Sequence, residues 1–255
     1  MIFVYIALGP QYIAECLESI LSMRGIGQFG GDIVVVTDQE VDPGSLDFRV
    51  VTLPKITGRA MGAGEKIRFF EHAEAAGIQI GKRPIAFLDS DMLALRRIDT
   101  AEILRHCARE RVNFYGYPER DQSYQYMAGL WTDDPTIIQS KGFCSGFMLA
   151  YDTPTIREAF DEMYQLYQKL LKRRNRKVCR FWDQPFLSYH LLRRELVCVG
   201  LDLLFVEERD GNREDYKRAM FCHFLGRRSE ARAARMRKVR KRLQRGSPTF
   251  DWVLA

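Results

Sequence analysis

The stretch of the sequence that carries the most chemical information is Ile85-Ala86-Phe87-Leu88-Asp89-Ser90-Asp91, an apolar run that ends in two carboxylates. The run is short and continuously apolar, which is typical of a buried strand. Residues two apart on an extended chain point to the same side, so Asp89 and Asp91 are expected to converge at the carboxyl end of this strand. Two converging carboxylates repel each other unless a cation lies between them. Mn²⁺ or Mg²⁺ suits such an oxygen-rich site and keeps positions open for phosphate oxygens. Taken alone, an acidic turn or a helix cap explains the motif equally well.

The first hundred residues, which must position these carboxylates, alternate between apolar strands and helical patterns. Strands are predicted at 2–8, 33–36, 48–53 and 85–88, and helices at 12–23 and 66–76. The strands are continuously apolar, which indicates a mostly parallel central sheet covered by helices on both faces. The predicted fold class is α/β, with a Rossmann-like arrangement. Ligands of such sheets bind beyond the carboxyl ends of the strands, where Leu8, Asp38 and Asp89 lie.

The rest of the chain continues with less regular elements. Helices are predicted at 101–109, 156–171 and 185–192, and strands at 113–117, 146–151, 203–207 and 220–223. We find no internal repeat and no linker within this region. We therefore predict one domain over residues 1–226, followed by a basic C-terminal tail at 227–255.

The positive charge of the chain is concentrated in this tail. Residues 227–245 contain ten Lys or Arg residues and one acidic residue, a net charge of +9; because the whole chain carries +6, the remainder carries −3. The acidic body argues against a nucleic-acid-binding domain. The tail is predicted to be a helix with a thin stripe of small or apolar residues: Ala231, Ala234, Met236, Val239 and Leu243. Such a helix suits either solvent or an anionic membrane surface.

The cysteines favour a reducing compartment, and the hydropathy pattern favours a protein without membrane spans. The six cysteines form no Cys-x-x-Cys pair and lie in apolar or amphipathic segments, so we expect free thiols. The N-terminal stretch lacks the basic leader of a signal peptide, and no apolar run has the length of a membrane span. We expect a cytoplasmic protein, with peripheral contact at the inner membrane as an open alternative.

Several further segments occur in the order and spacing of one enzyme family: Phe3-Val4-Tyr5-Ile6-Ala7 with Tyr12, Gly64-Glu65-Lys66-Ile67, Cys144-Ser145-Gly146, Trp182-Asp183-Gln184 and His223-Phe224-Leu225-Gly226. With Asp89-Ser90-Asp91 they make the chain resemble the A-type-fold glycosyltransferases, most closely family 8, the group of glycogenin and the bacterial lipopolysaccharide galactosyltransferases. The resemblance covers about residues 2–228.

This resemblance implies a metal-dependent transfer of a hexose from a UDP-sugar to an acceptor hydroxyl, with retention of anomeric configuration. It implies that His223 joins Asp89 and Asp91 as a ligand of Mn²⁺ or Mg²⁺, a role that suits imidazole nitrogen. The acceptor would be a glycan, a lipid-linked molecule or a protein. The resemblance also implies that the reaction belongs to bacterial surface glycan or lipopolysaccharide synthesis.

The resemblance also assigns residues to the donor. The nucleotide would contact Ala7, Leu8, Tyr12, Asp38 and Ser90, with Tyr12 able to stack on the base or to pack at a helix start. The diphosphate and sugar would contact Lys66 and the backbone of Ser145 and Gly146. Asp183, supported by Gln184, would stabilise positive charge at the anomeric carbon, although an Asp before Gln-Pro is also a good helix cap.

The sequence departs from the family at two positions. Cys144 stands where the family has Asn before Ser-Gly, and Ser229 stands where it has a lysine after the histidine motif. Near Gly226, Arg227 or Arg228 would have to reach the leaving phosphate in place of that lysine. These departures leave a non-catalytic nucleotide-sugar-binding relative open as an alternative. A nucleic-acid-binding protein that uses the basic tail is a third alternative.

Overall fold

The computed structural model describes residues 1–56, 58–107, 112–118, 131–136, 142–181, 183–201, 204–208, 213–224 and 230–245. Within them, one large sheet and one small sheet are formed by strands β1 (Ile2–Ile6), β2 (Asp32–Thr37), β3 (Arg49–Thr52), β4 (Ile85–Leu88), β5 (Met92–Ala94), β6 (Phe114–Pro118), β7 (Phe143–Ala150), β8 (Val197–Val199), β9 (Phe205–Glu207) and β10 (Phe221–His223).

The helices of the described residues are α1 (Pro10–Gly25), α2 (Arg59–Glu65), α3 (Phe69–Ala75), α4 (Thr100–Cys107), α7 (Pro154–Lys172), α8 (Arg176–Phe181), α9 (Asp183–Arg193), α10 (Arg213–Arg218) and α11 (Glu230–Gln244). Two short 3₁₀ turns, η1 (Gly44–Leu46) and η2 (Lys66–Arg68), lie between β2 and β3 and between α2 and α3.

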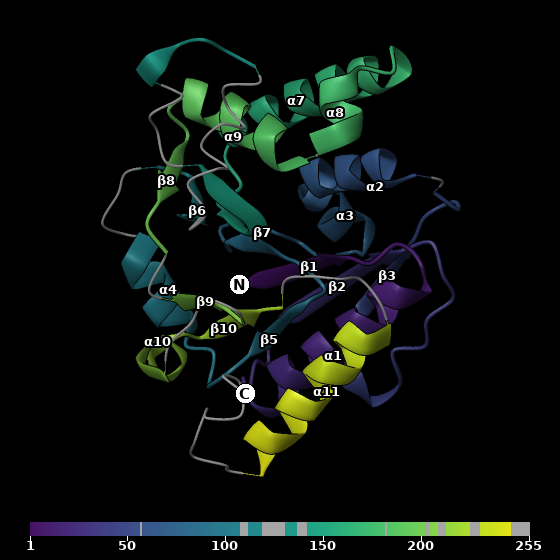
Figure 1. The fold of residues 1–255 in the computed structure, drawn as a ribbon, viewed down its shortest axis with the longest axis vertical. Helices are drawn as coiled ribbons and strands as arrows, with labels where there is room; N and C mark the ends of the chain where they lie inside the picture. The colour runs from purple at the N-terminus through teal and green to yellow at the C-terminus, as the bar shows by residue number, and fades with distance from the viewer. Residues whose placement is uncertain are drawn as a thin grey trace.

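The large sheet has seven strands in the order β3-β2-β1-β4-β7-β6-β8 (Figure 1). Strands β1, β2, β3 and β4 run parallel, and β7 runs antiparallel to both β4 and β6. The predicted α/β class with a mostly parallel central sheet is therefore confirmed. The carboxyl ends of β1, β2 and β4 meet at one edge, which is where a ligand site is expected.

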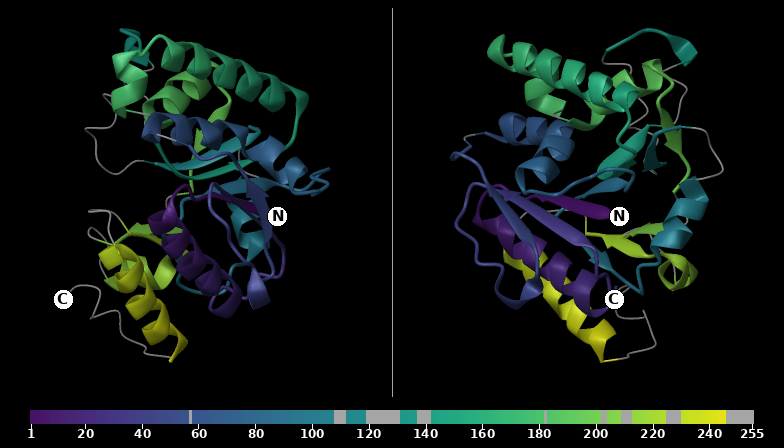
Figure 2. Two further views of the ribbon diagram at one scale, coloured as in Figure 1. Left: turned by 90° about the vertical axis from the view of Figure 1, so that its right-hand side faces the viewer. Right: turned by 180° about the vertical axis from the view of Figure 1, so that it is seen from behind.

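Both faces of the large sheet are covered, which explains why its strands are continuously apolar. Phe3 and Tyr5 of β1 face a core that includes residues of α1, α4 and the small sheet. Ile2 and Val4 face the opposite core, built with α2, α3, α7 and α9. Figures 1 and 2 show these two layers on opposite sides of the sheet. Alternate side chains of a strand thus enter different apolar cores.

The small sheet has the order β5-β10-β9 and adjoins the large sheet through a short connection. β4 ends at Leu88 and β5 begins at Met92, so only three residues separate the two sheets. β10 pairs with β5 so that His223 lies opposite Met92. Residues 89–91 and residue 223 are brought together by this pairing.

Some elements differ from the sequence prediction. Gly62 and Gly64, which precede the helix predicted at 66–76, lie in helix α2, which the sequence did not predict. A Cβ at Gly64 would meet the Tyr167 ring at 3.0 Å, and the Tyr167 hydroxyl donates to the carbonyl of Ala60 at 2.8 Å. Packing of α7 on α2 therefore outweighs the low helix propensity of glycine.

The predicted helix in the C-terminal segment is confirmed as α11, but its buried face differs from the prediction. Ala231 and Ala234 are exposed, whereas Ala233 and Met236 are buried beside Arg232. Helix α11 packs along α1, and the two lie side by side in Figures 1 and 2. The boundary proposed at residue 226 lies outside the described residues.

Acidic side chains of α1 explain this docking. Glu18 is almost fully buried and is paired with Arg237 at 2.6 Å and with Arg240 at 2.8 Å. Glu15, one turn earlier, is fully buried and is paired with Arg232. These arginines, which the sequence left to solvent or to a membrane surface, are engaged within the protein. None of the helices in the described part of the chain combines the length and apolar character needed to cross a bilayer.

Candidate active site

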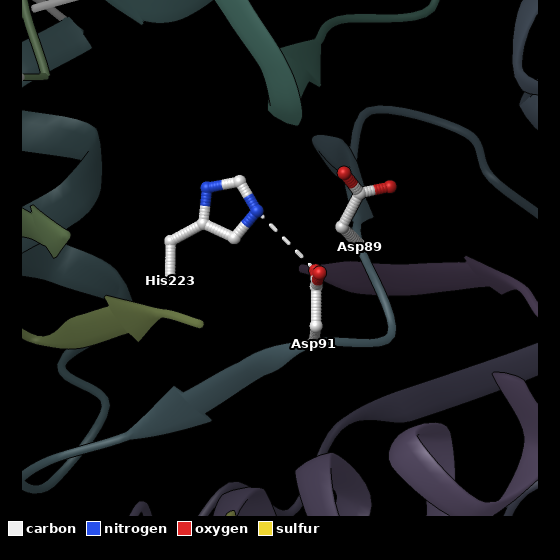
Figure 3. Close-up of side chains that lie close together, drawn as sticks. All are labelled: Asp89, Asp91 and His223. Carbon is white, nitrogen blue, oxygen red and sulfur yellow. Dashed lines mark ion pairs between the residues drawn. The ribbon is translucent and has the colours of Figure 1, made fainter. Parts of the chain in front are cut away.

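Asp89, Asp91 and His223, which the sequence predicted to hold a cation, lie together at the junction of the two sheets (Figure 3). One ligand atom of each residue lies within 4.8 Å of the other two. Bonds of about 2.1 Å to a small divalent cation separate two ligand atoms by at most about 4.2 Å, so small side-chain rotations bring all three onto one ion. Two carboxylates and one imidazole are donors that suit Mn²⁺. The residues present therefore fit a divalent cation.

Asp89 and Asp91 converge through a turn and not, as the sequence argument assumed, along an extended strand. The chain turns at Ser90–Asp91 between β4 and β5. The Asp89 N–H donates to the carbonyl of Gly146 at 2.8 Å, and the Phe224 N–H donates to the carbonyl of Asp91 at 2.9 Å. These backbone bonds fix the turn to β7 on one side and to the end of β10 on the other.

The ring of His223 is oriented by two residues behind it. The hydroxyl of Tyr117 lies 3.0 Å from Nδ1 of His223 and donates to Sγ of Cys144 at 2.8 Å. Because the Tyr117 hydroxyl hydrogen points to Cys144 Sγ, the Tyr117 oxygen can accept a hydrogen bond from the Nδ1–H of His223. The other ring nitrogen of His223, Nε2, then faces Asp91 at 3.3 Å. A hydrogen bond at one ring nitrogen fixes the tautomer that presents the other to a metal. Cys144 thus stands behind His223.

The charges of the triad depend strongly on one another. Burial disfavours the charged form of His223, but the adjacent Asp91 carboxylate outweighs burial and raises the pKa of His223 well above its usual value. Burial alone would raise the pKa of Asp91, yet His223 and Arg232 lower it. For Asp89, burial prevails over the attraction of Lys66, and its pKa is raised. In the absence of a metal, His223 and Asp91 therefore form a charged pair.

Lys66 connects the triad to Asp183. Its Nζ lies 2.9 Å from Oδ1 of Asp89 and 3.1 Å from Oδ2 of Asp183. Burial lowers the pKa of Lys66, but the two carboxylates outweigh burial and raise it above the usual lysine value, so the ammonium stays charged. Ser145 Oγ donates to Asp183 at 2.7 Å, and Gln184 Oε1 accepts from the Ser145 N–H at 3.3 Å. Asp183 is thus held by Lys66 and Ser145.

A cavity of about 500 Å³ lies over these groups, at the carboxyl ends of β1 and β4. This size suits a small-molecule site. Its lining includes apolar and aromatic residues, Ile6, Leu8, Tyr12 and Ile56, and charged residues, Lys66, Asp89, Asp91, Asp183 and Arg232. The cavity therefore combines apolar surface with charges of both signs.

Gly146 leaves the space that the triad needs. A Cβ at this position would lie 3.1 Å from Cε1 of His223, 3.2 Å from Oδ2 of Asp89 and 2.8 Å from Cε of Met92. We expect Gly146→Ala to weaken Mn²⁺ binding by about tenfold to a hundredfold, because displaced ligands cannot all reach one ion. Titration of Mn²⁺ followed by electron paramagnetic resonance measures this.

The matched control for this variant is Gly30→Ala, since a Cβ at Gly30 meets nothing within 4 Å. It is expected to bind Mn²⁺ as the unaltered protein does. Equal Mn²⁺ affinity in the Gly146→Ala protein would contradict the placement of the cation beside this glycine.

The residues predicted to contact the nucleotide are placed differently from one another. Leu8, Tyr12 and Ser90 line the cavity. The Ala7 N–H donates to the carbonyl of Val36 at 2.8 Å, so that donor is used within the sheet. Asp38 accepts from the Gly9 N–H at 2.8 Å. Asp38 thus holds the loop after β1 and is not among the lining residues.

Four residues named by the sequence argument cannot be placed. Trp182, Gly226, Arg227 and Arg228 lie outside the described residues. Their assignment to the donor site stays a prediction.

The sequence argument missed Arg232 and Glu15. Arg232 lines the cavity and pairs with Asp91 Oδ2 at 2.6 Å. Glu15 of α1 forms a two-armed contact with the same guanidinium, at 2.7 Å and 2.6 Å. The available signal was weak: two acids, Glu15 and Glu18, one turn apart on a helix near the start of the chain, and a helix rich in arginine near the other end of the sequence.

Comparison with known proteins bears on the fold. No protein-family model matches the chain, and no curated protein matches its sequence. Among solved structures, the chain is similar to the galactosyltransferase LgtC crystallised with donor and acceptor sugar analogues, with a TM-score of 0.59 and 14% identity over 94% of this chain and 95% of that chain. It is also similar to a glycosyltransferase involved in glycosylation of the major capsid of PBCV-1, with a TM-score of 0.62 and 11% identity over 93% and 100% of the two chains.

A third structure, mouse xyloside xylosyltransferase 1, matches with a TM-score of 0.51 and 13% identity over 89% of this chain and 98% of that chain. At such identities the likeness concerns the fold alone, and it extends over nearly the full length of each neighbour. The chain therefore has the A-type glycosyltransferase fold.

Proposed function

We propose that this protein is a metal-dependent glycosyltransferase that transfers a hexose from a UDP-sugar to an acceptor hydroxyl. The observation that carries the proposal is the meeting of Asp89, Asp91 and His223 beside a cavity that also contains Lys66 and Asp183. A divalent-cation site bordered by further charged groups is what a nucleotide diphosphate requires.

The composition of the cavity lining supports a nucleotide-sugar donor. Tyr12 and the apolar side chains Leu8 and Ile56 offer a surface on which a base can stack or pack. The charged residues would take the diphosphate and the sugar. We assign the nucleotide to the loop after β1 and the reacting carbon to the part of the cavity beside Lys66 and Asp183.

In the proposed reaction, the bond between the anomeric carbon and the phosphate oxygen breaks, the acceptor oxygen forms the new bond, and its proton passes to the phosphate oxygen of the departing UDP. A bound cation supplies neutralisation of the charge on the leaving phosphate. Lys66 adds a fixed positive charge beside it. Asp183 stabilises the positive charge that develops at the anomeric carbon, as in other reactions of oxocarbenium character. Ser145 and Gln184 hold Asp183 in position.

The finer parts of the proposal rest on the family resemblance. They are retention of anomeric configuration, Mn²⁺ as the cation, and an acceptor that belongs to a bacterial surface glycan or lipopolysaccharide. Peripheral contact with an anionic membrane stays a prediction of the basic C-terminal segment, weakened because Arg232, Arg237 and Arg240 pair with acids of α1.

The experiment that tests this function is calorimetric titration of UDP into the protein with Mn²⁺ and with EDTA. Binding is expected only with Mn²⁺, because the phosphates need the cation to approach Asp89 and Asp91. It is expected to disappear in Asp91→Ala. A screen of UDP-hexoses for release of UDP then identifies the donor.

Two other results would point elsewhere. Mn²⁺-dependent binding of UDP without turnover of any UDP-hexose would favour the non-catalytic nucleotide-sugar-binding alternative. Absence of UDP binding in both conditions, together with binding to RNA or DNA that falls steeply with salt, would favour the nucleic-acid-binding alternative.

A further inference from the structure

Arg232 is a buried cation that reaches the cavity from the last described helix. Its side chain is 7% exposed, it lines the cavity, and its guanidinium lies 2.6 Å from Oδ2 of Asp91. Asp91 Oδ1 lies next to His223, so if this oxygen held a cation, Oδ2 would stay on Arg232. The guanidinium therefore stands at the edge of the cation site.

Glu15 holds the guanidinium from behind. Nε and one terminal nitrogen of Arg232 donate to the two oxygens of Glu15 at 2.7 Å and 2.6 Å. Glu15 is fully buried, and a buried carboxylate is stable only when it is paired. The two-armed contact fixes the plane of the guanidinium. A guanidinium has five N–H groups, and the contacts with Glu15 and Asp91 do not use all of them.

We propose that Arg232, positioned by Glu15, binds the diphosphate of the donor, so that helix α11 forms part of the donor site. The inference rests on the proposed function, and it gives to Arg232 the role that the sequence argument gave to Arg227 or Arg228. Phosphate oxygens match the planar fork of arginine, and a guanidinium already held in place loses little freedom on binding.

The charges around the cavity agree with this role. Four carboxylates border the site, Glu15 included, and two permanent cations, Lys66 and Arg232, stand among them. The two cations lie on different elements, next to Asp89 and Asp91 respectively. A diphosphate bound to the metal would then be met by a positive charge on either side.

The docking of α11 supplies the rigidity that this role requires. Arg240 and Arg237 pair with Glu18, and Ala233, Met236 and Val239 are buried against the domain. Arg240 has the same chemistry as Arg232 and the same partner helix, but it does not line the cavity. It therefore provides a matched control for the effect of removing a buried arginine from α11.

The test compares three variants in titrations with UDP at saturating Mn²⁺ and with uridine, which has no phosphate. Because Arg232→Met alone would leave Glu15 buried without a partner, the main variant is the double substitution Glu15→Gln with Arg232→Met. We expect it to bind UDP on the order of tenfold to a hundredfold more weakly and to bind uridine and Mn²⁺ unchanged. Arg232→Lys is expected to keep part of the affinity because it keeps the charge.

Arg240→Met is expected to bind UDP as the unaltered protein does, since Arg237 still pairs with Glu18. Melting temperatures identify any variant that has lost its fold. Unchanged UDP affinity in the folded double variant, or an equal loss of uridine affinity, would overturn the assignment of Arg232 to the phosphates. Failure of the unaltered protein to bind UDP would instead overturn the proposed function, and this inference with it.

Discussion

Asp89→Asn is expected to lower kcat/KM for UDP release by on the order of a thousandfold and to abolish Mn²⁺-dependent binding of UDP. An amide is a neutral and weaker ligand than a carboxylate, and it also removes one of the two acceptors of Lys66. The ammonium keeps its second partner, Asp183, so the fold should remain. The measurements are calorimetry with UDP and Mn²⁺ and initial rates with the UDP-hexose found by the donor screen.

Asp99→Asn is the control for this variant. Asp99 is an exposed carboxylate whose nearest basic partner is Arg105 at 3.6 Å, remote from the cavity lining. Its replacement should leave both rate and affinity unchanged. Mn²⁺-dependent turnover at the normal rate in Asp89→Asn would show that the cation is held elsewhere.

Asp183→Asn is expected to lower the rate of the transfer step without weakening the binding of UDP. The variant should lose on the order of a hundredfold in kcat, because a negative charge near the developing positive charge at the anomeric carbon is removed. Its Mn²⁺-dependent affinity for UDP should change little, since Asp183 is not part of the triad and Asp89 still pairs with Lys66. The same calorimetric and rate measurements apply.

Ser145→Ala is the companion to this variant. It removes only the hydrogen bond from Ser145 to Asp183, so the loss in kcat should be smaller than that of Asp183→Asn. An Asp183→Asn protein that loses UDP affinity and rate together would mean that this carboxylate serves the donor's binding and not the transfer step.

The elements that the sequence predicted well are those with a long or continuous apolar pattern. Strands β1, β2 and β4 are buried on both faces, and α7 has a regular buried stripe; each leaves a clear trace in the sequence. Shorter elements were missed. β5 has three residues, and α2 contains two glycines, so neither pattern differs locally from a loop.

The site was predictable where residues adjoin a strand end. Asp89 and Asp91 follow β4, and Lys66 and Asp183 stand in segments that resemble the family. The contact between Glu15 and Arg232 joins residues 217 positions apart, and no local pattern records it. Tyr117 was missed for a similar reason, because the hydroxyl that orients His223 comes from a residue 106 positions earlier.

The path of the chain through the small sheet has a consequence for how the protein is made. The first 91 residues contain the parallel strands β1 to β4 and both aspartates of the triad, but β10 and α11 emerge from the ribosome more than a hundred residues later. Until then Glu15 and Glu18 are carboxylates without their arginines, on a helix that should lie against the sheet. Such long-range pairings form slowly. A nascent chain therefore has the framework of the domain before it has a complete cation site, and competence to bind a cation should arise only after β10 and α11 have been made.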